Sequence, residues 1–334
     1  MSEIRQTRNY NFHGLDLRIV CSAAIAESLD SRFRLLPSDG KQVGTISFDF
    51  QSVSDGSRHC VKRPQGEARL FYEFPSGEAC YFELGDQLYL AFKEGVRALG
   101  RPGLGCVSFS IVESEPANLF TATHLMLTIL LVELLKRRDC YSMHAAGFTK
   151  HGKAILIPGT SGAGKSTLAI TLLRGGFGYL SDDMTFLRRR LDRLEVLGFP
   201  EDVDVSDQTI RFFPELDFLG RSPKVAGWPK KQVRADQVYG AELVLEAQPG
   251  AIVIPQISGK ERSIVRPIDA DEALLELVSN VLLTEGRSCQ SHLSILTELV
   301  RQTPCYRLET GRDFDRIPFL LGELVSGSRE EIHA

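Results

Sequence analysis

The sequence predicts an α/β core that follows a β-rich N-terminal part, and three observations lead to this fold class. A glycine-rich segment, Gly159–Thr167, stands between the apolar run 154–157, typical of a buried strand, and the helix-like run 168–173. A second short strand pattern then leads into Asp182-Asp183. Before residue 118, alternating apolar and polar residues and turn signals predict strands. We therefore expect a β-rich domain over residues 1–117 and an α/β domain over residues 118–334.

The glycine-rich segment matches the phosphate-binding pattern G-x-x-x-x-G-K-[ST] in full. A strand, a glycine-rich turn and a helix N-terminus direct backbone N–H groups and the positive end of the helix dipole toward an anion. Lys165 can reach the β- and γ-phosphates of a nucleoside triphosphate, and the Ser166 hydroxyl can ligate Mg²⁺. The sequence therefore predicts a site for ATP and Mg²⁺ formed by Gly159, Thr160, Ser161, Gly162, Ala163, Gly164, Lys165, Ser166 and Thr167.

The acidic pair Asp182-Asp183 begins 17 residues after Lys165, a distance that one helix and one strand fill. Gly175-Gly176 ends the predicted helix, since glycine readily adopts the left-handed C-cap conformation. Carboxylates at the end of a strand near a bound triphosphate can hold the metal or accept a proton from an attacking hydroxyl. Because adjacent side chains on a strand point to opposite faces, the two aspartates should have different roles. A capping or turn pair is the alternative interpretation.

The residues from Met143 to Asp183 resemble HPr kinase/phosphorylase and the broader group of HPr-kinase-related proteins. The spacing from the lysine to the aspartate pair is the same as in that family. The match covers this segment alone, and the rest of the chain follows the related group only in the order of its parts. The matching elements are Met143-His144-Ala145-Ala146-Gly147, the apolar strand, the Gly159–Ser166 motif, the helix end Arg174-Gly175, and Ser181-Asp182-Asp183.

The resemblance implies a P-loop kinase core of the HPr kinase/PEP carboxykinase type with an N-terminal β-rich domain. It implies an enzyme that transfers the γ-phosphate of ATP to a serine hydroxyl of a protein or peptide substrate. By the same resemblance, Asp182 is the general base and His144 lies beside it in the active site, so that these two and Lys165 are the catalytic residues. Asp183 becomes a metal or water ligand, which makes Ser166 and Asp183 the implied metal ligands.

Three departures separate the chain from the HPr enzyme itself. Thr167 stands where that enzyme usually has glutamate, and Phe177 stands where it has histidine. No Arg-Gly-x-Gly-Ile-Ile-Asp segment, which in that enzyme is tied to the reverse reaction, follows the aspartate pair. We therefore expect a related kinase whose substrate is not HPr.

His144 has two interpretations. A histidine ahead of a buried strand is often a hydrogen-bonded structural residue, whereas the resemblance implies a place in the active site. An imidazole near two carboxylates tends to be held protonated, and it can then change the base strength of its neighbour. We therefore expect a charged His144 if it lies beside the acidic pair.

The composition is that of a soluble globular protein, with 43% hydrophobic and 25% charged residues. The net charge of −4 gives no electrostatic reason to expect binding to nucleic acid or to a membrane. Seven scattered cysteines without a Cys-x-x-Cys pair argue against a disulfide framework or a zinc site. They favour a reducing compartment, so we expect a cytoplasmic protein, and a homo-oligomer is an open possibility.

Other patterns organise the rest of the chain. The apolar segment 119–135 is at the short limit for a membrane span and predicts a buried helix that packs the two halves together. A basic stretch, Arg221–Arg234, predicts a loop that either covers the phosphates, grips an acidic substrate or is merely solvated. Strand patterns lie at 46–50, 70–74, 79–84, 88–92, 185–187, 194–197 and 251–255, and helical patterns at 210–219, 269–283 and 292–301.

The motif alone does not identify the phosphate acceptor, so three functions are compatible with the sequence. A serine kinase acting on a protein or peptide is the main hypothesis. A small-molecule kinase is the second, and a nucleotide-binding regulatory protein with weak ATPase activity is the third. The combination of Lys165, Ser166, Asp182 and Asp183 argues against a pure binder, which has little need of a base.

Overall fold

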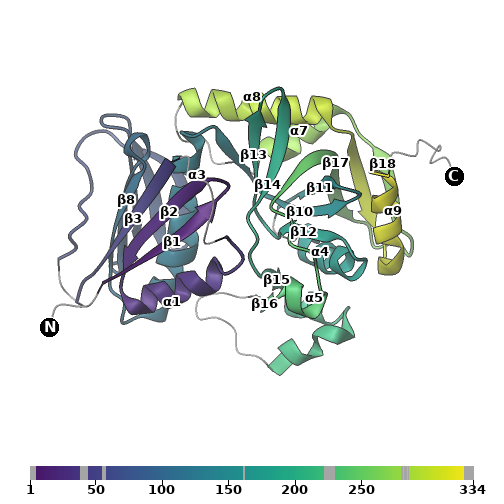
Figure 1. Cartoon of the computed structure of the whole chain (residues 1–334), viewed down its shortest axis with the longest axis horizontal. Coiled ribbons are helices and arrows are strands. Elements are labelled where there is room, and N and C mark those ends of the chain that lie inside the picture. Colours follow the sequence, from purple (N-terminus) through teal and green to yellow (C-terminus); the bar gives the residue numbers. More distant parts are fainter. Residues whose placement is uncertain are drawn as a thin grey trace. The chain divides into compact units, whose positions relative to one another are not determined.

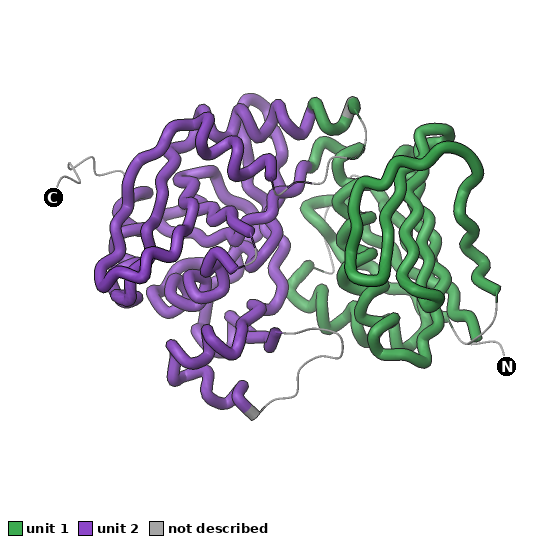
Figure 2. The backbone as a smooth tube through the Cα atoms, turned by 180° about the vertical axis from the view of Figure 1, so that it is seen from behind, with its two compact units in different colours: residues 1–140, 225–228, 282–290 green, residues 141–224, 229–281, 291–334 purple. Residues whose placement is uncertain are grey.

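The computed structural model describes residues 5–37, 44–54, 58–160, 162–221, 230–279, 281, 284 and 286–326. These residues form a mixed α/β protein with two large sheets (Figure 1). They fall into two compact units (Figure 2). Unit 1 is built mainly from residues up to Cys140, and unit 2 mainly from residues after it.

Within the described residues, unit 1 is built on an eight-stranded sheet with the order β1-β2-β3-β8-β7-β6-β5-β4. The pairs β2–β3 and β3–β8 are parallel, and the other neighbours are antiparallel. The strands predicted in this part, including the hairpin around residue 75, are confirmed. The strands are β1 (Gln6–Phe12), β2 (Leu15–Cys21), β3 (Gly44–Ser52), β4 (Arg69–Phe74), β5 (Gly77–Phe82), β6 (Gln87–Phe92), β7 (Val96–Arg101) and β8 (Cys106–Ile111).

A helix that the sequence patterns did not predict, α1 (Ala23–Arg32), joins the parallel strands β2 and β3. The Ser22 side chain caps it by accepting a hydrogen bond from the Ile25 N–H at 3.3 Å. Its buried face contains Ile25 and Leu29, which are spaced one helical turn apart. A parallel pair of strands requires such a crossover, so the β-rich part is not purely β.

The apolar segment forms a continuous helix made of α2 (Pro116–Phe120), a π-helical turn (Thr121–Met126) and α3 (Leu127–Lys136). Its length and composition would suit a membrane span, but 72% of the apolar window is buried within the protein. Asn118 Nδ2 donates to the Val112 carbonyl at 2.9 Å, and Leu130 fills the space beside Gly100 in β7. Because the helix packs on the N-terminal sheet, the units divide after Cys140 and not after residue 117 as predicted.

Unit 2 contains, among the residues described, a nine-stranded sheet with β17 at its centre. The path β12-β10-β11-β17-β14-β13-β9 is joined by β19, which pairs with β17 and β18. The strands predicted at 154–157, 185–187, 194–197 and 251–255 are confirmed. The strands are β9 (Cys140–Met143), β10 (Ala145–Lys150), β11 (Lys153–Pro158), β12 (Gly178–Ser181), β13 (Thr185–Arg190), β14 (Arg193–Gly198), β17 (Glu246–Ile257), β18 (Ile264–Pro267) and β19 (Cys305–Thr310).

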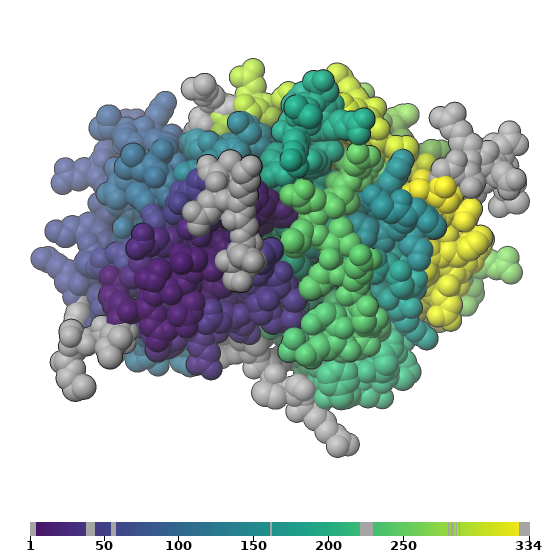
Figure 3. Space-filling view, in the orientation of Figure 1, coloured from purple at the N-terminus to yellow at the C-terminus, as the bar shows by residue number. Residues whose placement is uncertain are grey.

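Helices cover both faces of this sheet (Figure 1). Alternate residues of β11 face opposite ways: Ile155 and Ile157 pack with α4 and α9, whereas Ala154 and Leu156 pack with α7 and α8. The C-terminal helix α9 lies at the surface, in yellow in Figure 3, and contacts α4. The remaining elements are α4 (Lys165–Arg174), a two-stranded ribbon of β15 (Val203–Val205) and β16 (Lys231–Val233), α5 (Asp207–Ile210), a 3₁₀ segment (Pro214–Arg221), α6 (Ala235–Val238), α7 (Ala270–Val278), α8 (Gly286–Gln302) and α9 (Ile317–Glu323).

Candidate functional site

The glycine-rich loop lies between the end of β11 at Pro158 and the start of α4 at Lys165, as the sequence predicts. Gly162 and Gly164 have φ values of 90° and 91°, in the left-handed region that L side chains rarely adopt. Gly164 is the N-cap of α4, and no side chain caps the first turn. The N–H groups of that turn are therefore available to an anionic ligand. Ser161, predicted to belong to the site, lies outside the described residues.

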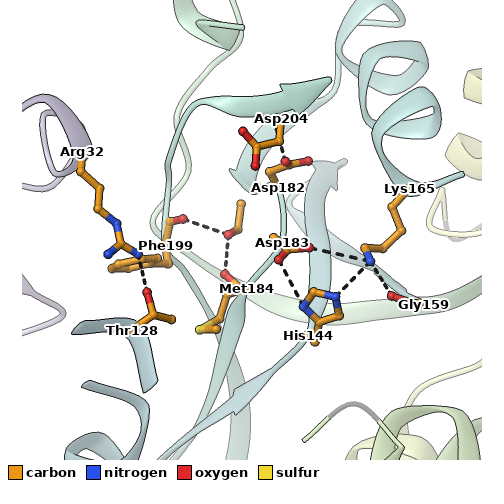
Figure 4. Close-up of polar contacts among 11 residues, drawn as sticks. Arg32, Thr128, His144, Gly159, Lys165, Asp182, Asp183, Met184, Phe199 and Asp204 are labelled. Atoms are coloured by element: carbon orange, nitrogen blue, oxygen red, sulfur yellow. Dashed lines mark hydrogen bonds and ion pairs between the residues drawn. The ribbon is translucent and has the colours of Figure 1, made fainter. Parts of the chain in front are cut away.

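Lys165 stands at the centre of a polar network of three side chains and one carbonyl (Figure 4). Its Nζ lies 3.1 Å from His144 Nε2 and 3.7 Å from Asp183 Oδ1, and it also donates to the Gly159 carbonyl. His144 Nδ1 lies 3.3 Å from Asp183 Oδ2. The imidazole therefore bridges the lysine and the aspartate, so three residues predicted for the site are brought together.

The protonation of His144 differs from the sequence-based expectation of a charged imidazole. Burial lowers its pKa, and the Lys165 and Lys230 charges lower it further, although Asp183 acts in the opposite direction. A lysine ammonium has only donors, so we assign Nε2 as the acceptor and Nδ1 as the protonated nitrogen that faces Asp183. The expectation failed because burial and a neighbouring cation outweigh the carboxylate.

The two aspartates of the acidic pair have different environments, as expected for neighbours at a strand end. Asp182 is buried, and its Oδ2 accepts the backbone N–H of Asp204 at 2.9 Å. Burial raises the pKa of Asp182 to about 8, and the nearby charges of Asp183 and Asp204 act in the same direction. Asp183 is 56% exposed. A carboxyl group in the position of Asp182 thus holds a proton more tightly than an ordinary aspartate does.

A cavity of about 870 Å³ connects these residues, and all of its described lining belongs to unit 2. Its polar lining includes the loop, Lys165 and Ser166, and both aspartates. Its lining also includes Phe212 and Phe314, whose ring centroids are 5.3 Å apart. The cavity therefore combines a site for anions with an apolar surface that can receive a flat ring.

The oxygen donors near the loop are compatible with Mg²⁺ carried by a nucleotide. The Ser166 hydroxyl and the carboxylates of Asp182 and Asp183 line the same cavity. In the part of the chain that the structure describes, no group of three or more His, Cys, Asp or Glu residues is arranged to hold a metal. Magnesium commonly takes one or two protein ligands and completes its shell with phosphate oxygens and water. The donor set fits that mode of binding.

The sequence did not predict the roles of two residues near the site. Asp204 donates its backbone N–H to Asp182, and Lys230 lines the cavity. Lys230 belongs to the predicted basic loop, of which residues 222–229 lie outside the described residues. Its neighbour Lys231 is buried and bonded to backbone carbonyls, so the alternative of a merely solvated loop does not hold for this residue. In the sequence, the only indication that Lys230 belongs to the site was its place in the basic stretch Arg221–Arg234.

Comparison with known proteins finds likeness only among solved structures. No protein-family model matches the sequence, and no curated protein sequence matches it. Among solved structures, the chain is similar to the Hpr(Ser) kinase/phosphatase from Coxiella burnetii, with 13% sequence identity and a TM-score of 0.31. That match covers 55% of this chain and 93% of the other. A likeness of this size carries no conclusion about activity, so the function is inferred from the site.

Proposed function

We propose that this chain is an ATP-dependent phosphotransferase of the HPr-kinase-related type, with a P-loop core, that transfers the γ-phosphate to a serine hydroxyl of a protein or peptide. The observation that supports this most is the meeting of Lys165, Ser166 and the acidic pair on one cavity beside the uncapped start of α4. Binding of a phosphate chain alone would not need two carboxylates beside the anion site, because they repel it. The cytoplasmic location belongs to the same proposal.

The chemistry of the lining favours one orientation of ATP. Its phosphates would lie at the loop, where Lys165 and the N–H groups of α4 neutralise their charge. Its base would lie toward Phe212 and Phe314, since a purine ring packs well against aromatic side chains. Thr167 and Thr171, one turn apart on α4, also line the cavity.

Asp182 is the residue that would accept the proton of the attacking serine. It lies on the cavity, and its Oδ2 is oriented by the Asp204 N–H. Burial raises its pKa, so its ionised form, which the Lys230 charge favours, is a stronger base than an ordinary aspartate. Ser166 and Asp183 would hold Mg²⁺, which when bound neutralises charge on the β- and γ-phosphates. His144 would act as a positioning residue, because its two ring nitrogens set the places of Lys165 and Asp183.

Transfer from γ-labelled ATP with Mg²⁺ tests the proposal. The acceptor is unknown, so a host-cell lysate separated into protein, peptide and small-molecule fractions serves as the source of acceptors. We expect label on a serine of a protein or peptide with the wild type, and loss of this label with Asp182→Asn while ATP still binds. Asp192→Asn, at the exposed turn between β13 and β14, is the matched control and should transfer normally.

The other outcomes are equally informative. Label in the small-molecule fraction alone would replace the protein acceptor with a metabolite. ATP binding without transfer to any fraction would contradict the kinase and favour a regulatory nucleotide binder. Transfer that survives Asp182→Asn would show that Asp182 is not the base.

A further inference from the structure

The β15–β16 ribbon borders the candidate site. Lys230, a cation that the predicted site does not include, directly precedes β16. Val203, Val205 and Val233 of the ribbon are buried in the core of unit 2. Three antiparallel pairs join its strands, the last of them between Val205 and Lys231. Lys230 directly precedes this pair, so its backbone position is fixed by a short ladder that the core anchors.

The ribbon is attached to the acidic pair by a hydrogen bond. The backbone N–H of Asp204, the middle residue of β15, donates to Asp182 Oδ2 at 2.9 Å (Figure 4). Asp204 pairs with Gln232 in the ladder, two residues from Lys230. The element that orients the carboxyl group of Asp182 therefore also brings Lys230 to the site.

Lys230 and Lys231 have different environments. Lys231 is buried, and its Nζ donates to the carbonyl oxygens of Leu219 at 2.5 Å and Gly220 at 3.0 Å, which is a structural role. Lys230 lines the cavity together with both aspartates of the acidic pair. The difference arises where the chain enters β16, because Lys231 is the first residue of that strand and Lys230 precedes it. Among the described residues, Lys230 forms no ion pair within 4.0 Å.

Lys230 lines the same cavity as the loop lysine. Lys165, Ser166 and residues of the glycine-rich loop are also part of that lining. In this cavity, the anion of a bound triphosphate would be the natural partner of Lys230.

We propose that Lys230 is a second phosphate-binding cation of this site, which contacts the γ-phosphate of the bound nucleotide together with Lys165. The inference rests on the proposed phosphotransferase function. In that reaction the acceptor oxygen bonds to the γ-phosphorus, and the bond from that phosphorus to the bridging oxygen breaks. ADP leaves with the electron pair, and the acceptor proton passes to Asp182. Lys230 exchanges no proton and stabilises the negative charge on the transferred group.

The affinities for Mg-ATP and Mg-ADP, measured by titration calorimetry, test this assignment without a known acceptor. Lys230→Met should weaken Mg-ATP binding about tenfold, the effect of losing one charge-assisted hydrogen bond, and leave Mg-ADP binding close to that of the wild type. Lys230→Arg keeps the charge and should restore most of the preference for ATP. Arg234→Met is the matched control, because Arg234 follows the same ribbon, pairs with Asp236 and does not line the cavity.

The results separate two kinds of failure. If Lys230→Met changes the two affinities equally, or changes neither, Lys230 does not contact the γ-phosphate, and the proposed function is unaffected. If the wild type binds neither nucleotide, the phosphotransferase proposal fails and the assignment of Lys230 fails with it. An ATP-specific loss in Lys230→Met that the arginine variant reverses supports the assignment. Far-UV circular dichroism of each variant confirms that the comparison is made between folded proteins.

Discussion

His124 predicts a specific loss of stability in acid. It lies in the π-helical turn of unit 1, where its ring stacks on Phe120 with centroids 4.2 Å apart. Its Nδ1 is 3.0 Å from the Thr123 hydroxyl, and Arg32 of α1 donates to its carbonyl oxygen at 3.1 Å. Burial lowers the pKa of His124 to about 3, with a further contribution from the charge of Arg32. The folded protein therefore keeps this imidazole neutral.

The direction and size of the effect follow from the two pKa values. The unfolded chain takes up a proton at an ordinary histidine pKa of about 6.5, whereas the folded chain resists it until about pH 3. The stability that the neutral His124 contributes is thus fully present above about pH 6.5. It is lost progressively as the pH falls from about 6.5 toward about 3. Between pH 7 and pH 5, this group alone should lower the free energy of unfolding by about 2 kcal/mol.

Urea unfolding followed by far-UV circular dichroism at pH 7 and pH 5 measures the effect. His124→Gln removes the ionisable group, so its free energy of unfolding should fall by about 2 kcal/mol less than that of the wild type over this range. His124→Phe, which keeps an aromatic ring against Phe120, should behave in the same way. Carboxylates affect all three proteins alike and cancel in the comparison. Parallel pH dependences for wild type and variants would refute the argument that the folded protein holds His124 in its neutral form.

Three other substitutions test the site and the core. Gly164→Val places a β-branched residue at a φ of 91°, so calorimetry should show at least a tenfold weaker affinity for ATP; unchanged affinity would mean that the loop does not hold the phosphates. Phe314→Ala should weaken the affinity for ATP about tenfold and leave the affinity for inorganic tripolyphosphate unchanged. The control Phe319→Ala, at an exposed residue, should change neither affinity. Equal effects of Phe314→Ala on both ligands would show that the adenine base does not bind beside Phe314. Glu133→Gln removes the carboxylate that lies 2.6 Å from buried Lys136 and leaves the lysine charge without its partner. The free energy of unfolding should therefore fall by about 3 kcal/mol in urea titrations. A loss well under 1 kcal/mol would contradict the interpretation that the two side chains form a buried ion pair.

The parts of the site that the sequence could predict are those whose signal is local. The loop, the strand before it and the helix after it are contiguous, so one motif predicts all three, and the structure has them at the expected positions. The strand before the acidic pair was also found, because glycines precede its apolar residues and the two aspartates follow them. Its place in the sheet was not, since β10 lies between β12 and β11. Sheet order depends on tertiary pairing, which spacing alone does not encode.

The parts that could not be predicted depend on contacts between distant segments. The hydrogen bond from Asp204 to Asp182 uses a backbone N–H, which any residue other than proline supplies, so no residue type marks it. The apolar helix was identified, but which unit it packs against depends on side chains such as Leu130 that fit beside a glycine of β7. Helix α1 was missed because its ten residues carry only two large apolar side chains on the buried face.

The neutral state of His144 changes how the loop lysine and the acidic pair must behave on binding. Lys165 is bonded to the Gly159 carbonyl and to His144, and Asp183 faces both the lysine and the imidazole. A phosphate that attracts Lys165 would draw the lysine charge away from His144 Nε2. The pKa of His144 would then rise, because a nearby cation disfavours the protonated imidazole. Asp183 is exposed enough to turn toward a metal carried by the same phosphate. Nucleotide binding would therefore exchange one set of ion pairs for another, and the cost of separating Lys165 from Asp183 would be offset by the phosphate and the metal.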